Sequence, residues 1–200
     1  MYKKWWILAA VACGTFMATL DSSIVNIALP TLTKALTAEL YQIKWVIVIY
    51  LLVITCLLLP LGRVSDQYGR KKTLLLGFSI FTMGSMLCGF SFNLLTLLGS
   101  RMVQAIGAAM LMANGPAVIT HSFLSGERGK ALGTLAMVVS AGLISGPSIG
   151  GLLITTFGWP SIFFVNIPFG VFGIILVHRY LHCFCIDAVL FRAGSSFCSR

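Results

Sequence analysis

Six apolar runs, each about as long as a lipid bilayer is thick, restrict the possible folds of this sequence more than any other feature. They occupy residues 5–29, 45–61, 73–92, 94–119, 131–157 and 162–181. A helix of about 20 apolar residues crosses the hydrocarbon core of a membrane, and a spanning helix satisfies its backbone polar groups internally. We therefore predict an all-α integral membrane protein in which six transmembrane helices form one bundle.

The composition favours the same class. Of the 200 residues, 58% are hydrophobic and only 10% are charged, whereas a soluble domain carries about 25% charged residues. The net charge of +9 is a property of many nucleic-acid-binding proteins, but most of these cations lie in short loops between apolar runs. We therefore expect the lipid bilayer, and no nucleic acid, as a partner. The sequence contains no catalytic Ser/His/Asp constellation, metal-ligand spacing or phosphate loop, so we expect no enzyme, no metal and no cofactor.

The distribution of Lys and Arg predicts the orientation of the bundle. One side carries nine cations, which are Lys3, Lys4, Arg63, Arg70, Lys71, Lys72, Arg128, Lys130 and Arg179. The other side carries two, Lys34 and Lys44. Because positively charged loops stay in the cytoplasm, we predict that the N-terminus and the end of the sixth helix are cytoplasmic.

Asp21 and Arg101 are the acid and the base that lie deep inside apolar runs. Each costs about 2.5–3.5 kcal/mol at mid-membrane on insertion scales, and such groups usually face a partner or a cavity. At 1.5 Å per residue, Asp21 lies about 12 Å from the outer end of its helix, and Arg101 lies about 10 Å inside the same face. We therefore predict that they meet at one depth. Burial favours the neutral carboxyl group and a guanidinium favours the charged one, so the pair can serve proton coupling. The alternative is a static pair that joins two helices.

The densest cluster of charge lies in the loop at residues 62–72, whose glycines permit a tight reversal. An ordinary cytoplasmic loop also carries such cations. The spacing of Gly62, Asp66 and Gly69, followed by Arg70 and Lys71, resembles the loop between helices 2 and 3 of the major facilitator superfamily. That resemblance implies that these five residues form a cytoplasmic gate in which Asp66 and Arg70 join a charge network.

Two further segments carry the resemblance into the membrane. Residues 18–30, around Asp21, look like the first-helix motif of the 14-helix drug:proton antiporters of that superfamily. This implies that Asp21 and Asn26 belong to the proton and substrate pathway, although Asn26 can equally make an ordinary hydrogen bond between helices. Residues 98–109 are similar to the fourth-helix motif, which implies proton coupling for Arg101 and a place in the substrate pathway for Gln104. This motif departs from the family at Ser100 and Ala105, where glycine is usual.

The fifth run contains the sequence Gly-x-x-x-Gly-Pro-x-x-Gly-Gly, formed here by Gly142, Gly146, Pro147, Gly150 and Gly151. Three of its glycines recur every four residues, so they share one helix face and allow close backbone contact, and the proline removes a helical hydrogen bond. The sequence resembles the antiporter motif of the superfamily, and it can also be a general packing face of small residues.

The resemblance covers nearly the whole chain and implies the N-terminal six-helix bundle of a major facilitator fold at residues 1–181. Residues 182–200 match nothing in that family, and we interpret them as an unmatched tail, with a frameshift as our hypothesis for its origin. A complete relative has fourteen helices, and its site lies between two bundles. The expected function is that of the N-terminal half of a multidrug efflux transporter in the bacterial inner membrane, which exchanges protons for lipophilic or cationic compounds and is inactive without its C-terminal half. The alternative is a non-transporting membrane module that needs a partner chain or an oligomer.

Overall fold

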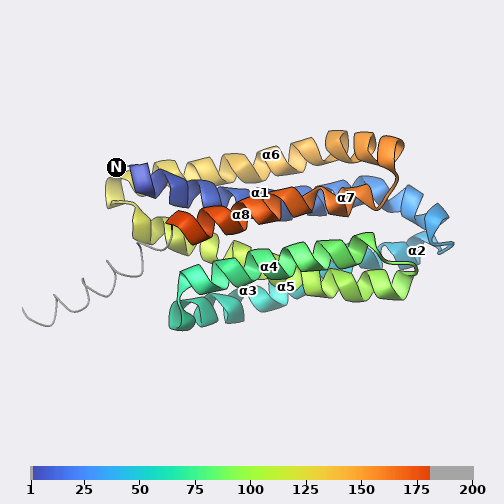
Figure 1. Ribbon diagram of the computed structural model, residues 1–200, viewed down its shortest axis with the longest axis horizontal. Coiled ribbons are helices and arrows are strands. Elements are labelled where there is room, and N and C mark those ends of the chain that lie inside the picture. Colours follow the sequence, from blue (N-terminus) through green and yellow to red (C-terminus); the bar gives the residue numbers. More distant parts are fainter. Residues whose placement is uncertain (1, 181–200) are drawn as a thin grey trace, which may run out of the picture.

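The computed structural model describes residues 2–180, and these form a bundle of helices that run along a common direction (Figure 1). In chain order the helices are α1 (Tyr2–Ala35), α2 (Leu40–Ile43), α3 (Trp45–Tyr68), α4 (Arg70–Gly89), α5 (Leu94–Ser122), α6 (Ser125–Phe157), α7 (Ser161–Phe164) and α8 (Asn166–Tyr180). Among the described residues, six stretches are long and apolar enough to cross a membrane. The last of these stretches comprises α7 and α8 together. The prediction of an all-α protein with six spans is confirmed, and the predicted tail at 182–200 lies outside the described residues.

The helices extend beyond the apolar runs that predicted them. The first helix continues to Ala35 and the second span continues to Tyr68, because a helix satisfies its own backbone outside lipid as well as inside it. The interpretation of Gly62 as part of a tight reversal is therefore wrong, since Gly62 lies inside α3. The reversal occupies the single residue Gly69, whose φ of 97° lies in the region that favours glycine.

The packing of the helices relates the first three spans to the last three. In Figure 1, α6, α1 and α8 lie on one side of the bundle, and α3, α4 and α5 lie on the other. Helix α1 packs along α6, and α5, which is the first helix of the second set of three, packs along α3. Helices α4 and α8, the third of each set, pack against each other. In each set of three, the first helix therefore packs along the second helix of the other set, and the two third helices pack together. This symmetry agrees with an internal repeat of three plus three helices.

Small residues let α4 approach α5 closely at the level of the predicted charged pair. A Cβ atom on Gly84 would lie 2.6 Å from the Cα of Gln104, and one on Gly107 would collide with the backbone of Phe81. The two helices therefore pack backbone to backbone, as small residues permit in membranes. This contact carries Gln104 and Arg101 toward the centre of the bundle, where both side chains are fully buried.

Candidate functional site: a buried ion pair at the bundle centre

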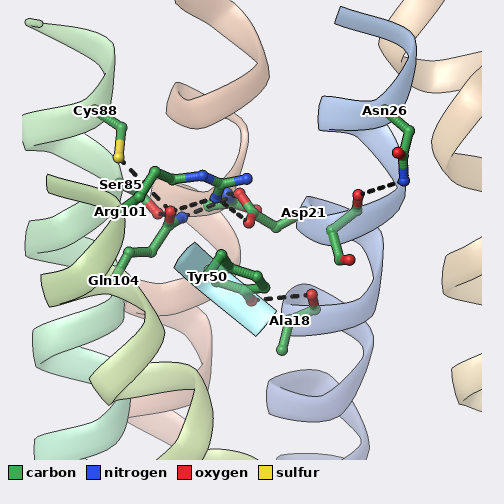
Figure 2. Close-up of polar contacts among 10 residues, drawn as sticks. Ala18, Asp21, Asn26, Tyr50, Ser85, Cys88, Arg101 and Gln104 are labelled. Atoms are coloured by element: carbon green, nitrogen blue, oxygen red, sulfur yellow. Dashed lines mark hydrogen bonds and ion pairs between the residues drawn. The ribbon is translucent and has the colours of Figure 1, made fainter. Parts of the chain in front are cut away.

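Asp21 of α1 and Arg101 of α5 meet in the middle of the bundle (Figure 2). The Nη1 atom of Arg101 donates a hydrogen bond of 2.6 Å to Oδ2 of Asp21. The side chains are 1% and 0% exposed, so the pair is screened from solvent and its electrostatic interaction is strong. The prediction that these two residues lie at one depth and in contact is confirmed.

Two amide side chains complete the surroundings of the carboxylate. Gln104 donates from Nε2 to Asp21 Oδ1 at 3.0 Å and to Ser85 Oγ at 2.7 Å, while its Oε1 accepts from Arg101 Nη1 at 2.6 Å. Asn166, the first residue of α8, donates from Nδ2 to the same Oδ1 atom of Asp21 at 2.8 Å. One carboxylate therefore receives N–H donors from a guanidinium and from two amides, and donors of this kind stabilise its charged form.

Aromatic rings cover the guanidinium group. The Cζ atom of Arg101 lies 4.6 Å from the ring centroid of Tyr50 and 5.2 Å from that of Phe163, distances at which a ring face attracts a cation. The Tyr50 hydroxyl donates to the carbonyl of Ala18 at 3.2 Å and so ties α3 to α1. Within the part of the chain that the structure describes, Arg101 Nε and Nη2 have no acceptor. The positive charge thus depends mainly on Asp21 for compensation.

The sequence motifs gave functional roles to Asp21, Arg101 and Gln104, but they gave none to Ser85, Tyr50 and Asn166. Each of these three is a buried polar group within or beside an apolar run, which is the one signal that could have singled them out. Choosing them as partners of Asp21 requires knowing which face of α3, α4 and α8 is turned inward, and that depends on the packing of the whole bundle.

Asn26 is not part of this cluster. Its side chain is exposed and points away from Asp21 (Figure 2). Its Nδ2 atom donates to the carbonyl of Ser22, one turn earlier in α1, at 3.2 Å. The two residues that the sequence motif places together therefore lie on different faces of α1. The structure does not bring Asn26 together with Gln104, the other predicted pathway residue.

The charged end of α3 is fixed to the rest of the bundle. Arg70 Nη2 lies 3.0 Å from Asp66 Oδ1, and Arg70 Nη1 donates to the carbonyl of Ala117 in α5 at 2.6 Å. Arg70 lies in α4, so these two bonds join α4 to α3 and to α5. A buried hydrogen bond between Ser65 and Asn114 joins α3 directly to α5. Of the other residues predicted for this gate, Gly69 forms the turn and Lys71 lies half-buried in the first turn of α4.

The glycines of the fifth span form the contact between α6 and α1. Gly142, Gly146 and Gly150 are buried, and Cβ atoms on them would press on Thr19, Ser23 and Ile24 of α1. The Ser23 hydroxyl donates to the carbonyl of Leu143 at 2.7 Å across this seam. Pro147 is exposed and Gly151 has no neighbour within 4 Å of a Cβ position, so both lie off the seam.

Six apolar spans around a desolvated ion pair define a polytopic α-helical membrane protein with ionisable groups in its core. The chain belongs to the Major Facilitator Superfamily, whose match covers residues 11–183. Its relatives carry the names of transporters and resistance proteins, not of enzymes.

Three comparisons place the chain within that family. It is 45% identical over 181 residues to a riboflavin transporter of Clostridioides difficile (strain 630), covering 90% of this chain and 40% of the relative. It is 38% identical over 177 residues to a methylenomycin A resistance protein of Bacillus subtilis (strain 168), covering 88% and 38%. The fold resembles a bacterial homologue of the human lysosomal transporter Spinster, with a TM-score of 0.71 and 18% identity over 90% of this chain and 43% of that one. The chain thus spans about 40% of the length of the curated relatives that it matches.

Proposed function

We propose that this chain is the N-terminal six-helix bundle of a transporter that exchanges protons for lipophilic, often cationic compounds. Its N-terminus would lie in the cytoplasm and the bundle in the inner membrane of a bacterium. The observation that carries the proposal is the buried pair of Asp21 and Arg101, because ionisable groups at membrane depth are costly and are usually kept for ion or substrate pathways. Names of relatives that confer antibiotic resistance support the efflux direction.

Asp21 is the group that would carry the proton. Its charged form is held by Arg101, Gln104 and Asn166, and its neutral form would release much of that attraction. Since the carboxyl group is 1% exposed, water reaches it only if α1 and the helices that cover this carboxyl group move apart. Binding of a proton would therefore favour a different arrangement of α1, which is the kind of coupling between site and conformation that transport requires.

Two other parts of the bundle would serve that movement. The glycines of α6 lie directly against Thr19, Ser23 and Ile24 of α1, so α1 could move along this seam by exchanging the Ser23 hydrogen bond to Leu143 and shifting few large side chains. The bonds of Arg70 to Asp66 and to Ala117 would hold the cytoplasmic ends of α3, α4 and α5 together. Asn26, exposed on another face of α1, would line the substrate pathway between this bundle and a second one.

Two other candidate functions have specific support. The 45% identity with a riboflavin transporter favours riboflavin, an uncharged aromatic compound, as the transported molecule. The coverage of only 40% of that relative favours a membrane module that needs a partner bundle, either a C-terminal half or a second chain. In a facilitator the substrate site lies between two bundles, so we expect the 200 residues alone to be inactive.

Transport assays in cells separate these possibilities. The chain is expressed alone, and also together with the C-terminal portion of the Clostridioides difficile riboflavin transporter, in a riboflavin auxotroph that is sensitive to methyl viologen. Resistance of the paired strain to this organic cation supports efflux, and growth on low riboflavin supports riboflavin uptake. If the protein inserts correctly and the strain shows neither phenotype, the non-transporting module is favoured.

The role of Asp21 is tested in the paired strain, with whichever of the two compounds that strain transports. Asp21→Asn keeps the shape of the side chain but cannot change its charge, so we expect insertion to persist and proton-driven transport to be lost. Glu39→Gln, which neutralises an exposed acid before α2, is the matched control and should transport normally. Unchanged proton-driven transport in Asp21→Asn would remove this carboxyl group from the mechanism.

A further inference from the structure

Asn166 differs from Gln104, the other amide that bonds Asp21, because one end of its side-chain amide makes no hydrogen bond. Its Nδ2 atom donates to Asp21 Oδ1 at 2.8 Å. Its Oδ1 atom is buried and, within residues 2–180, accepts no hydrogen bond. A buried amide oxygen without a donor is uncommon in folded proteins and calls for an explanation.

The amide of Gln104 bonds the same carboxylate oxygen, but both of its ends are engaged. Its Nε2 atom donates to Asp21 and Ser85, and its Oε1 atom accepts from Arg101. Turning this amide by 180° would break these three bonds and the one that Oε1 accepts from the Cys88 thiol at 3.7 Å, and it would set an NH2 group against the guanidinium donors. Gln104 is therefore fixed in one orientation, whereas turning Asn166 would break a single bond.

A proton on Oδ1 of Asp21 changes what this oxygen needs. The charged carboxylate only accepts hydrogen bonds, whereas the protonated acid has an O–H that must donate. The Asn166 amide can turn so that its unpaired Oδ1 atom accepts a hydrogen bond from this O–H group. The Gln104 amide cannot, because it is fixed in one orientation. The proton stays on Asp21 throughout, and the amide exchanges an N–H···O bond for an O–H···O bond.

We propose that Asn166 is a positioning residue whose amide turns when Asp21 takes up a proton, and that it thereby reports the protonation of α1 to α8. The inference rests on the proposed protonation of Asp21 and adds to it a second residue with two defined states. The hydrogen bond between Asn166 and the protonated acid is weaker than the one between Asn166 and the charged carboxylate, because hydrogen bonds to charged groups are about twice as strong as neutral ones.

The position of Asn166 suits it to pass this change to the backbone. It is the first residue of α8, and α7 ends at Phe164. Pro168 has no N–H to donate to the carbonyl of Phe164, which weakens the helix at this point. Phe163, before the break, lies on the Arg101 guanidinium, and Asn166, after it, lies on the Asp21 carboxylate. The interrupted span thus contacts both members of the ion pair, one on each side of the break.

The other titratable groups near this pair are fixed by bonds of their own. Those that face it are Arg101 from α5, Tyr50 from α3 and Cys88 from α4, and the parts of α1, α6, α7 and α8 packed around the pair add none among the described residues. Arg101 keeps its charge at any ordinary pH, the Tyr50 hydroxyl bonds the Ala18 carbonyl, and the Cys88 thiol faces Gln104 Oε1 at 3.7 Å. Asp21 is therefore the group whose titration Asn166 would follow.

Nuclear magnetic resonance of the 200-residue chain in lipid nanodiscs tests the inference directly. The Asp carboxyl carbons and the side-chain amides of Asn and Gln are isotopically labelled and followed over a pH titration. We expect the Asn166 N–H resonance to lose its hydrogen-bonded shift through the same midpoint as the Asp21 carboxyl carbon, while Gln104 keeps its bonded N–H. Asn114 is the matched control, because this buried amide bonds Met110 and Ser65 through its two ends and should not follow that midpoint.

The variant Asp21→Leu should abolish the pH response of Asn166, and unchanged signals of Asn26, Asn93 and Asn114 would show that it is folded. The wild-type titration decides the matter even if this variant does not fold. If the Asp21 carboxyl titrates and Asn166 keeps its bonded N–H, or if Asn166 and Gln104 change alike, the inference fails while the proposed role of Asp21 stands. If Asp21 does not titrate at all, both fail.

Discussion

Separating the two members of the buried pair should affect stability unequally. Asp21→Leu leaves the guanidinium of Arg101 fully buried, with Gln104 Oε1 and two aromatic rings as its remaining partners. Removing one member of a buried ion pair costs about 3–5 kcal/mol of unfolding free energy. Arginine cannot escape this cost by losing its proton, so the buried pair should add no pH dependence to the unfolding free energy of Asp21→Leu.

Arg101→Met should behave differently, because it leaves Asp21 without its cation. A buried carboxyl group can avoid the cost of its charge by binding a proton. The folded variant then holds more protons than the unfolded one, so its unfolding free energy should fall as pH rises and recover as pH is lowered. The two single variants, alike in cost at high pH, should diverge in acid.

The double variant Asp21→Leu/Arg101→Met removes both charges. Apolar replacement of a whole buried pair is often neutral, although Gln104 and Asn166 lose their acceptor here at about 1–3 kcal/mol for an unsatisfied group. The double variant should therefore be more stable than Asp21→Leu alone, despite carrying one more change. Reversible unfolding of the chain in mixed micelles, by titration with sodium dodecyl sulfate and circular dichroism, measures all four proteins. A double variant destabilised by the sum of the two single costs would refute the argument that these charges compensate each other.

Two further predictions concern the glycines. Gly146→Leu should lower the unfolding free energy by about 1–3 kcal/mol by overpacking, since a Cβ there would lie 2.5 Å from the Ser23 side chain. Gly151→Leu should be tolerated, because there is open space at the Cβ position of Gly151. Equal losses of unfolding free energy in the two variants would contradict the assigned seam. Gly69→Ala should lower the unfolding free energy by about 1–3 kcal/mol because of the φ of 97° at this residue. Gly62 lies inside α3 and has no near neighbours, so Gly62→Ala should raise the unfolding free energy by about 0.5–1 kcal/mol. A destabilised Gly62→Ala would argue that the reversal begins at this residue.

The sequence was sufficient for the spans and for the meeting of the charged pair. Length and hydropathy determine which segments lie in lipid, and counting residues from the outer face gives depth along each helix. Depth placed Asp21 and Arg101 at one level, and the cost of an unpaired charge inside the membrane favoured a contact between them. The sequence was not enough for the helix ends, because apolar runs mark the lipid boundary, and α3 continues past it to Tyr68.

The sequence did not show how the helices are arranged around one another in the plane of the membrane, or which face of each helix is turned inward. Asn166 and Ser85 reach the site only because α8 and α4 turn particular faces inward, and this depends on the packing of all the helices together. For Asn26 the spacing did hold a signal. Five residues after Asp21 is a rotation of about 140° around a helix, so the two side chains could not share a face, as the structure shows.

The most direct test of the account is whether substrate binding expels a proton from Asp21. The chain, paired with the C-terminal portion of its relative, is purified in detergent in weakly buffered solution, and methyl viologen is added while the pH is recorded. The account predicts proton release upon binding by the wild type and none by Asp21→Asn at the same occupancy. Equal release by both proteins, or binding to the wild type with no release, would contradict it.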